Sequence, residues 1–105
     1  MVDSQFKKGI LELCVLGVLF QEMSYGYEIY KKVSSEMEIS ESTIYPILRR
    51  LVKQGYIDTV KKSSQSGPPR KYYTLSATGL GYYQSQKKSW RQLTNHVERL
   101  IGGKL

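Results

Sequence analysis

Between residues 44 and 75 the hydrophobic pattern of the chain changes its period. Apolar residues first recur every three or four positions, as on one face of an α-helix, at Ile44, Ile47, Leu48, Leu51 and Val52. Gly55 then ends the helix, and residues 56–60 and 72–75 are aromatic and β-branched, as is typical of strands. The basic, turn-rich stretch at 61–71 is too long for a two-residue turn. The sequence therefore predicts a helix followed by a β-hairpin with a projecting tip.

Further helices are expected on both sides of this unit, at residues 5–21, 25–37 and 77–101. Ser24 and Ser76 are suited to cap the second and the last of these helices. Gly79 and Gly81 should loosen the first turn of the last helix, because glycine is a poor helix former.

These elements predict an α+β fold that is mostly α. The arrangement is a winged helix-turn-helix, with three helices and a β-hairpin wing, extended by a long C-terminal helix. An all-helical bundle would leave the Tyr-rich segment with its Pro-Pro interruption unexplained. The expected domains are residues 1–76, which would bind DNA, and residues 77–105, which would form a dimerisation helix.

The first predicted helix is apolar almost all round, so it must be covered on more than one face. A chain of 105 residues would struggle to do this alone, which indicates a partner subunit. Glu12 interrupts the apolar run at 10–20, and the run is shorter than the roughly 20 residues that span a bilayer. We therefore expect a buried helix, no membrane contact and no export signal. The protein should be cytoplasmic, with Cys14 as a reduced thiol in the core.

The charge of the chain is concentrated in its second part. The formal net charge is +7, from 16 Lys and Arg against 9 Asp and Glu. Residues 1–41 hold four Lys and seven Asp or Glu, a net of −3, whereas residues 42–105 hold twelve Lys or Arg and two Asp or Glu, a net of +10. This distribution points to a polyanionic partner for the second part of the chain.

The third predicted helix is polar and basic on the side opposite its apolar stripe. Its outer face carries Ser42, Pro46, Arg49 and Lys53, and its flanks carry Thr43, Tyr45 and Arg50. As on a recognition helix, Arg49 is expected to donate to guanine and Lys53 to contact phosphate. Pro46 costs little if the helix begins at Ser42 or Thr43, whereas a start at Ser40 should distort it. The alternative is a merely solvated basic face, which the charge of the hairpin disfavours.

The hairpin resembles a DNA-binding wing in its composition. Four cations, Lys61, Lys62, Arg70 and Lys71, flank a tip that contains Gly67 and Pro68. Glycine allows close approach of the backbone, and proline stiffens the tip. Cations beside a thin projection suit contact in or beside the minor groove of double-stranded DNA. An ordinary solvated loop is the alternative.

These segments together resemble the PadR family of winged-helix transcriptional regulators. The resemblance rests on YGYEI (25–29), STIYPILRRL (42–51), GYI (55–57) and GPPRKYYTLS (67–76), followed by Gly79. It implies a homodimeric repressor that binds a roughly palindromic operator and releases it on binding a small molecule. It also implies dimerisation through the first helix, with Leu11, Val15 and Val18, and through the last helix, as in the family's short subgroup. Ala77 departs from the acidic residue that is frequent in the family, which leaves the start of the last helix open.

The last predicted helix carries an apolar seam. Trp90, Leu93, Val97 and Leu100 are spaced by three, four and three residues, and Tyr83 extends the series backward by one heptad. So long a helix would overhang so small a domain, so we expect the seam to bind a second copy; packing on the chain's own core is the alternative. Such a dimer would hold two recognition helices about 34 Å apart, one turn of DNA.

Trp90 is also a candidate for effector binding. A flat indole near a two-fold axis could sandwich a planar aromatic cation or drug. In the multidrug-responsive relatives that the resemblance brings in, a tryptophan near this position lines such a pocket. The alternative is that Trp90 only packs the dimer interface. His96 is expected to be a flanking polar residue and not a pH sensor.

Catalysis finds no support in the composition. One Cys excludes an internal disulfide, and one Cys with one His cannot by themselves hold zinc. No nucleophile and base are paired, and no glycine-rich phosphate loop is present, so we expect no enzyme, no catalytic residue, no metal and no cofactor. The alternatives to an operator-binding regulator are a winged-helix module that binds RNA and one that binds only protein.

Overall fold

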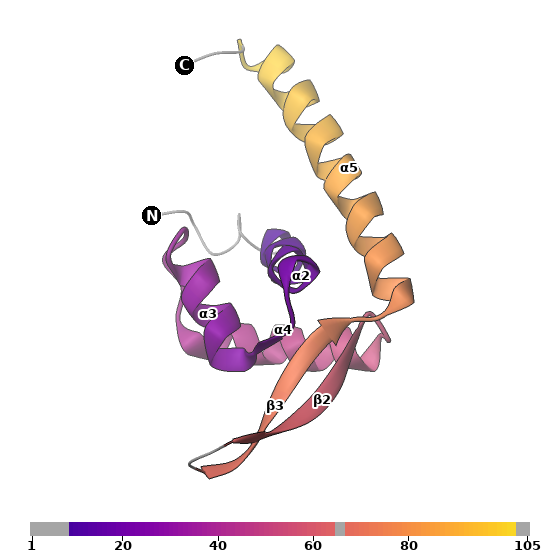
Figure 1. Cartoon of the computed structure of the whole chain (residues 1–105). Coiled ribbons are helices and arrows are strands. Elements are labelled where there is room, and N and C mark those ends of the chain that lie inside the picture. The colour runs from indigo at the N-terminus through magenta and orange to yellow at the C-terminus, as the bar shows by residue number, and fades with distance from the viewer. Residues whose placement is uncertain (1–8, 65–66, 103–105) are drawn as a thin grey trace.

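The computed structural model describes residues 9–64 and 67–102 (Figure 1). Within these residues four helices and three strands follow in the order α2 (Ile10–Gln21), β1 (Ser24–Tyr25), α3 (Gly26–Ser34), α4 (Glu41–Lys53), β2 (Ile57–Ser64), β3 (Gly67–Leu75) and α5 (Ala77–Leu100). The strands form one antiparallel sheet in the order β1-β3-β2. This confirms the predicted α+β class with helices in the majority, a hairpin wing and a long C-terminal helix.

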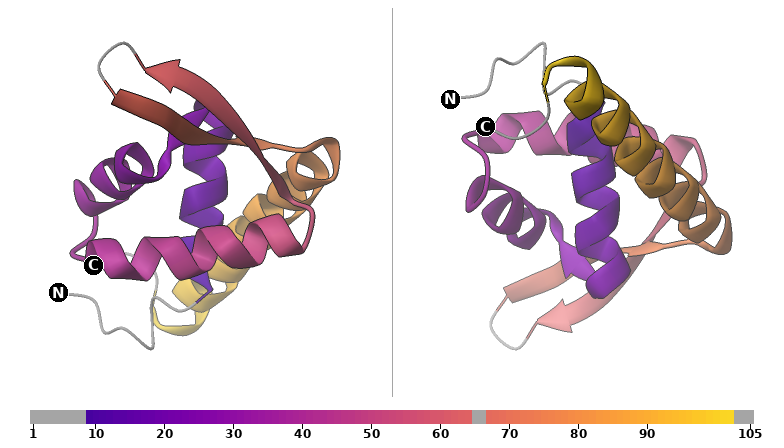
Figure 2. Two further views of the ribbon diagram at one scale, coloured as in Figure 1. Left: turned by 90° about the horizontal axis from the view of Figure 1, so that it is seen from below. Right: turned by 90° about the horizontal axis from the view of Figure 1, so that it is seen from above.

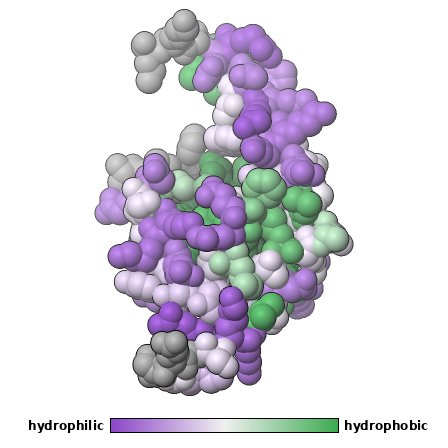
Figure 3. All heavy atoms as spheres, viewed as in Figure 1, coloured by the Kyte–Doolittle hydropathy of each residue, from purple (hydrophilic) through white to green (hydrophobic). Residues whose placement is uncertain are grey.

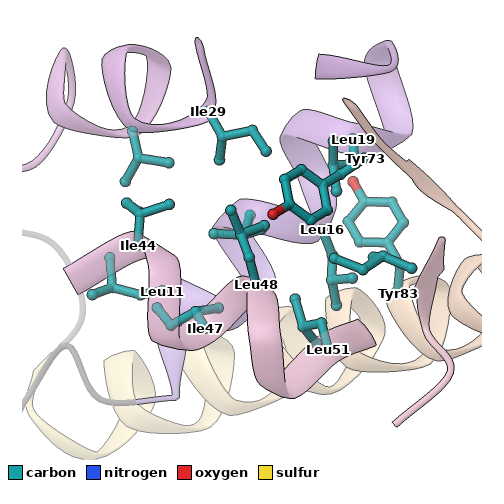
Figure 4. Packing of buried hydrophobic residues seen from close by; sticks show 13 residues of the cluster. Leu11, Leu16, Leu19, Ile29, Ile44, Ile47, Leu48, Leu51, Tyr73 and Tyr83 are labelled. Carbon is teal, nitrogen blue, oxygen red and sulfur yellow. The ribbon is translucent and has the colours of Figure 1, made fainter. Parts of the chain in front are cut away.

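Helix α2 lies at the centre of the molecule. It contacts α3, α5 and β3, and the view from below shows it behind a frame of α3, α4 and the hairpin (Figure 2). Figure 4 shows Leu16 of α2 near Leu48 of α4 and Tyr83 of α5, and the same cluster continues to Ile29 of α3 and Ile44 of α4. The predicted stripe of the third helix is confirmed, since Ile44, Ile47, Leu48 and Leu51 are buried.

The central place of α2 corrects part of the predicted dimer seam. Leu11 and Val15 are buried in the core of the single chain, and so is Tyr83 of α5. Because the chain itself covers these three side chains, they have almost no surface left for a partner. Val18 is half-buried. None of the helices within residues 9–64 and 67–102 is long and apolar enough to cross a membrane.

The segment before α3 differs from its prediction. Residues 24 and 25 form the short strand β1, which pairs with Tyr72 and Tyr73 of β3, and helix α3 begins only at Gly26. Ser24 is therefore not a cap: it is buried, and its hydroxyl donates to the carbonyl of Glu22 at 3.2 Å. Pairing with a strand far along the chain leaves no local signal, which is why the sequence pattern did not predict it.

The wing is longer than the sequence predicted. Strands β2 and β3 extend through almost all of the stretch at 61–71, with Lys61 paired to Lys71 and Lys62 paired to Arg70. The register shifts between Lys62 and Ser64. Lys, Ser, Gly and Pro are typical of loops, but the backbone ladder that starts in the aromatic part of the hairpin continues through them. Residues 65 and 66 at the tip lie outside the described residues.

The two long helices settle the questions that the sequence left open. Helix α4 begins at Glu41 with Ser40 as its N-cap, so Pro46 lies beyond the first turn, and the helix is nevertheless continuous to Lys53. Helix α5 begins at Ala77, and the hydroxyl of Ser76 accepts from the backbone N–H of Gly79 at 2.9 Å, as predicted.

Gly79 has a structural role that differs from the one the sequence predicted. A Cβ atom at this position would overlap the carbonyl oxygen of Tyr56 and lie 2.7 Å from its carbonyl carbon. Glycine is thus required where α5 crosses the turn that follows α4, and it does not merely loosen the helix. At Gly81 a Cβ atom would meet nothing within 4 Å.

The distal half of α5 extends beyond the rest of the chain. Figure 3 shows this half clear of the body, with hydrophilic side chains on its outer side. Four apolar side chains of this half are nevertheless exposed: Trp90, Leu93, Val97 and Leu100, the last with 86% of its surface accessible. The overhang that the sequence predicted is therefore present.

Candidate nucleic-acid interface

The outer face of α4 is exposed and rich in hydrogen-bond donors. Ser42, Pro46, Arg49 and Lys53 all lie exposed there, as the sequence predicted. At the N-terminal end the hydroxyl of Ser40 lies 2.9 Å from that of Ser42 and 3.1 Å from that of Thr43. Short hydroxyls at the start of a helix followed by cations are the arrangement with which a recognition helix contacts base edges and phosphates.

Tyr45 occupies the flank of α4 that faces the wing. Its ring packs directly over Gly26, where a Cβ atom would come within 2.6 Å of the ring, so any larger residue at the start of α3 would displace the ring. Its hydroxyl donates to Oε2 of Glu41 at 2.9 Å. Burial, and next the carboxylate of Glu41, raise the pKa of Tyr45 above its ordinary value. Tyr45 therefore stays a neutral phenol and fixes the distance between α3 and α4.

A polar notch of about 350 Å³ opens between α4 and the wing, lined by Gly26, Tyr45, Arg49, Lys71 and Tyr73. The guanidinium of Arg49 comes from the recognition helix and the ammonium of Lys71 from strand β3. Burial raises the pKa of Tyr73, and the nearby charge of Arg49 opposes that rise. Two cations and a phenol converging from two elements suit an anionic oxygen such as that of a phosphate.

The hairpin distributes its four cations over two faces, because successive residues of a strand point to opposite sides. Lys71 shares the notch with Arg49, and Lys61 is its cross-strand partner. Lys62 and Arg70 form the next pair and point to the other side. Of the four wing cations, Lys61 and Lys71 are therefore on the side of the recognition helix.

Aromatic rings order the cations on the other face of the wing. Arg70 lies over the ring of Tyr25 at 4.4 Å, and Lys62 lies over the ring of Tyr72 at 5.1 Å. The two rings meet edge to face at 5.4 Å. These contacts connect the wing to β1 and thus to the start of α3. The sequence pattern does not predict this contact between Tyr25 and Tyr72, because only the pairing of β1 with β3 brings the two residues together.

Arg50, one of the predicted DNA contacts, faces a carboxylate within the single chain. It lies on the flank of α4 away from the notch, and its Nε and Nη2 atoms both lie 3.4 Å from Oε2 of Glu12 on α2. Gly67 and Pro68 are exposed at the start of β3, next to the tip of the wing. The structure thus brings Tyr45, Arg49 and Lys71 together and holds Arg50 elsewhere.

A second, apolar groove of about 530 Å³ lies between the distal half of α5 and the start of α2. It is lined by Gly9, Ile10, Trp90, Leu93, Thr94, Val97 and Glu98. The indole of Trp90 is 39% exposed and also borders a smaller neighbouring hollow with Leu13 and Gln86. The predicted effector residue therefore lines an open apolar surface.

The described residues contain no group of three or more His, Cys, Asp and Glu side chains that could hold a metal ion. Cys14 is half-buried on α2, and burial raises the pKa of its thiol. A thiol in that state is a poor nucleophile.

The fold and the basic surface of α4 and the wing define a DNA-binding transcriptional regulator of the winged-helix class. The sequence pattern of the transcriptional regulator PadR-like family matches residues 15–85, about two thirds of the chain. The chain therefore belongs to the PadR-like family, which consists of DNA-binding regulators and not of enzymes.

Solved structures agree with this assignment over nearly the whole chain. A PadR-like transcriptional regulator from Bacillus cereus is 39% identical, with a TM-score of 0.86 over 96% of this chain and 100% of that one. A transcriptional regulator from Streptococcus is 33% identical, with a TM-score of 0.86 over 95% and 100%. A PadR family regulator from Clostridium difficile is 30% identical, with a TM-score of 0.82 over 90% and 100%.

Proposed function

We propose that the chain is a homodimeric repressor that binds a palindromic operator and releases it when a small molecule binds. The observation that carries the DNA contact is the convergence of Arg49 from α4 and Lys71 from β3 on one notch. In this proposal residues 1–76 contact DNA and residues 77–105 pair the two copies. The protein would act in the cytoplasm, where its operator lies.

The exposed seam of α5 supports the dimer. Trp90, Leu93, Val97 and Leu100 keep the spacing of three, four and three residues that one helix presents to another. All four are exposed in the single chain, and the groove beside them is apolar. A second copy of α5 would bury this surface, and a two-fold axis would then present two recognition helices to successive turns of DNA.

The groove beside Trp90 supports the effector. Its volume of about 530 Å³ is in the range of pockets that hold drug-sized molecules. A planar aromatic cation would stack on the indole and lie near the carboxylate of Glu98, which also lines the groove. Because the same surface forms the proposed dimer seam, a bound molecule would alter the distance between the two recognition helices.

A mobility-shift assay on the DNA upstream of the protein's own gene, with excess nonspecific competitor, tests the DNA contact. Arg49→Ala should abolish or relax sequence specificity, because a guanine contact is worth about 1–3 kcal/mol. Lys71→Ala should weaken binding to all sequences and lower the salt slope by about one unit. The matched control is Arg91→Ala, which removes an exposed cation from α5. Equal losses in Arg49→Ala and Arg91→Ala would contradict the proposed interface.

A further inference from the structure

A polar cluster joins three helices on the far side of α4 from the wing. The carboxylate of Glu12 on α2 accepts from the hydroxyl of Tyr82 on α5 at 2.9 Å and faces the guanidinium of Arg50 on α4 at 3.4 Å. The Glu12 side chain is only 16% exposed, whereas that of Arg50 is 51% exposed. One half-buried carboxylate thus contacts the recognition helix and the C-terminal helix at the same time.

The cluster extends toward both functional surfaces. The ring of Tyr82 stacks on that of Tyr56 at 4.0 Å with an angle of 4° between the planes, and Tyr56 belongs to the turn that leaves α4. The amide of Gln86 donates to the hydroxyl of Tyr82 at 3.3 Å, and Gln86 borders the hollow beside Trp90. A continuous set of contacts therefore runs from the recognition helix to the groove on α5.

This cluster differs in kind from the other contacts between these helices. Elsewhere α2 packs on α5 through apolar groups, such as the ring of Phe20 against that of Tyr83 at 5.0 Å, and apolar packing is non-directional. Hydrogen bonds to a carboxylate have preferred directions and short distances, and charged partners strengthen them. Within the described residues, the Glu12 cluster is therefore better suited than apolar packing to fix the angle between α4 and α5.

We propose that Glu12 is a positioning residue that fixes the orientation of α4 relative to α5, and thereby the spacing of the two DNA half-sites that the dimer accepts. The inference rests on the proposed function, because it needs a dimer paired through α5 that reads two half-sites. The spacing between two α4 helices in such a dimer depends on the α4–α5 angle in each copy. A loosened angle would let the dimer accept several spacings with similar affinity.

The cluster offers variants that separate its parts. Glu12→Ala removes both interactions, whereas Glu12→Gln removes the charge that holds Arg50 and keeps an acceptor for Tyr82. Tyr82→Phe removes the hydroxyl and keeps the stacked ring on Tyr56, so it should fold even where Glu12→Ala does not. The matched control is Glu22→Ala. It removes an exposed ion pair, Glu22 at the end of α2 with Lys32 on α3 at 3.2 Å, which does not involve α5.

The probes are DNA duplexes chosen by the wild-type protein from a random-sequence pool. The selected half-site is then placed once, or as an inverted repeat whose spacer changes in single-base-pair steps, and affinities are measured for each duplex. The wild type should bind the preferred spacing about tenfold or more tightly than the neighbouring spacings, which is a typical coupling between two sites. In Glu12→Ala and Tyr82→Phe this ratio of affinities should fall to about threefold or less. Affinity for the single half-site should stay unchanged.

Three other results would contradict either the positioning role of the Glu12 cluster or the proposed dimeric function. Wild-type spacing profiles in both Tyr82→Phe and Glu12→Gln would refute the positioning role of the cluster. A uniform loss of affinity at every spacing in Arg50→Ala, single half-site included, would show that Arg50 contacts DNA and would also refute the role. A wild type that shows no preference for paired half-sites would instead refute the proposed dimeric function.

Discussion

Gly79 is the position where a single methyl group should damage this fold most clearly. In Gly79→Ala the new Cβ atom would overlap the carbonyl oxygen of Tyr56, so the start of α5 must move away by on the order of 1 Å. Two hydrogen bonds hold the helix at this place. The backbone N–H of Ser76 donates to the same Tyr56 oxygen at 3.1 Å, and its hydroxyl donates to the carbonyl of Gly55 at 2.7 Å.

The cost follows from the contacts that such a movement disturbs. Each of the two hydrogen bonds contributes about 0.5–1.5 kcal/mol to the free energy of unfolding. The stack of Tyr82 on Tyr56 contributes a similar amount of about 0.5–1.5 kcal/mol. Alanine recovers about 1 kcal/mol through its higher helix propensity. The net destabilisation of Gly79→Ala should be about 0.5–3.5 kcal/mol, and the midpoint of thermal unfolding should fall by about 4–8 °C for each kcal/mol.

Gly81 supplies the matched control two residues further along α5. It is exposed and a Cβ atom there meets nothing within 4 Å, so Gly81→Ala should stabilise the chain by about 0.5–1 kcal/mol. Both variants are compared with wild type by denaturant unfolding at one fixed protein concentration, because dimerisation makes stability concentration-dependent. If Gly79→Ala proved as stable as Gly81→Ala, the close crossing of α5 over Tyr56 would be refuted.

Three further predictions concern α5. Val97→Glu should place a charge in the proposed seam and leave the protein monomeric at micromolar concentration in sedimentation; a dimer of unchanged stability would contradict the seam. A planar cationic dye should quench the fluorescence of Trp90, the single Trp of the chain, and Trp90→Leu should weaken binding, followed by the dye's own fluorescence, by about tenfold; unchanged dye affinity would leave Trp90 as packing alone. Burial, and next the hydrogen bond to Glu12, raise the pKa of Tyr82 above its ordinary value of 10.0. The folded state therefore favours the neutral phenol, so its contribution is complete below pH 10 and lost as the pH rises through the raised pKa. Tyr82→Phe should lose less stability than wild type between about pH 9 and pH 11 in denaturant unfolding, and an equal loss in both would contradict this reasoning.

Local patterns predicted the elements that carry the DNA-binding surface. The stripe that includes Ile44 and Leu48 is a short-range signal of helix α4, and Ser76 caps α5 through a residue three positions away. The outer position of Arg49 follows from the same helical geometry. These features depend on neighbours in the sequence, so the sequence alone was sufficient to predict them.

Features that depend on distant partners were not predictable in this way. Strand β1 exists because residues 24 and 25 meet β3, and Arg50 forms an ion pair because folding brings Glu12 beside it. The need for glycine at position 79 comes from the carbonyl of Tyr56, which folding alone brings there. Leu11 was expected in the seam because an apolar helix can be covered equally by its own chain or by a partner.

The position of the exposed seam along the chain has a consequence for how the protein is made. Within the described residues the buried core lies between Leu11 and Tyr83, whereas the exposed apolar seam of α5 begins at Trp90. During synthesis from the N-terminus, the proposed dimer seam of α5 is therefore made after all residues that the winged helix needs to fold. Two copies can therefore pair through this seam only after every residue of the winged-helix core has been synthesised, which favours pairing between folded copies.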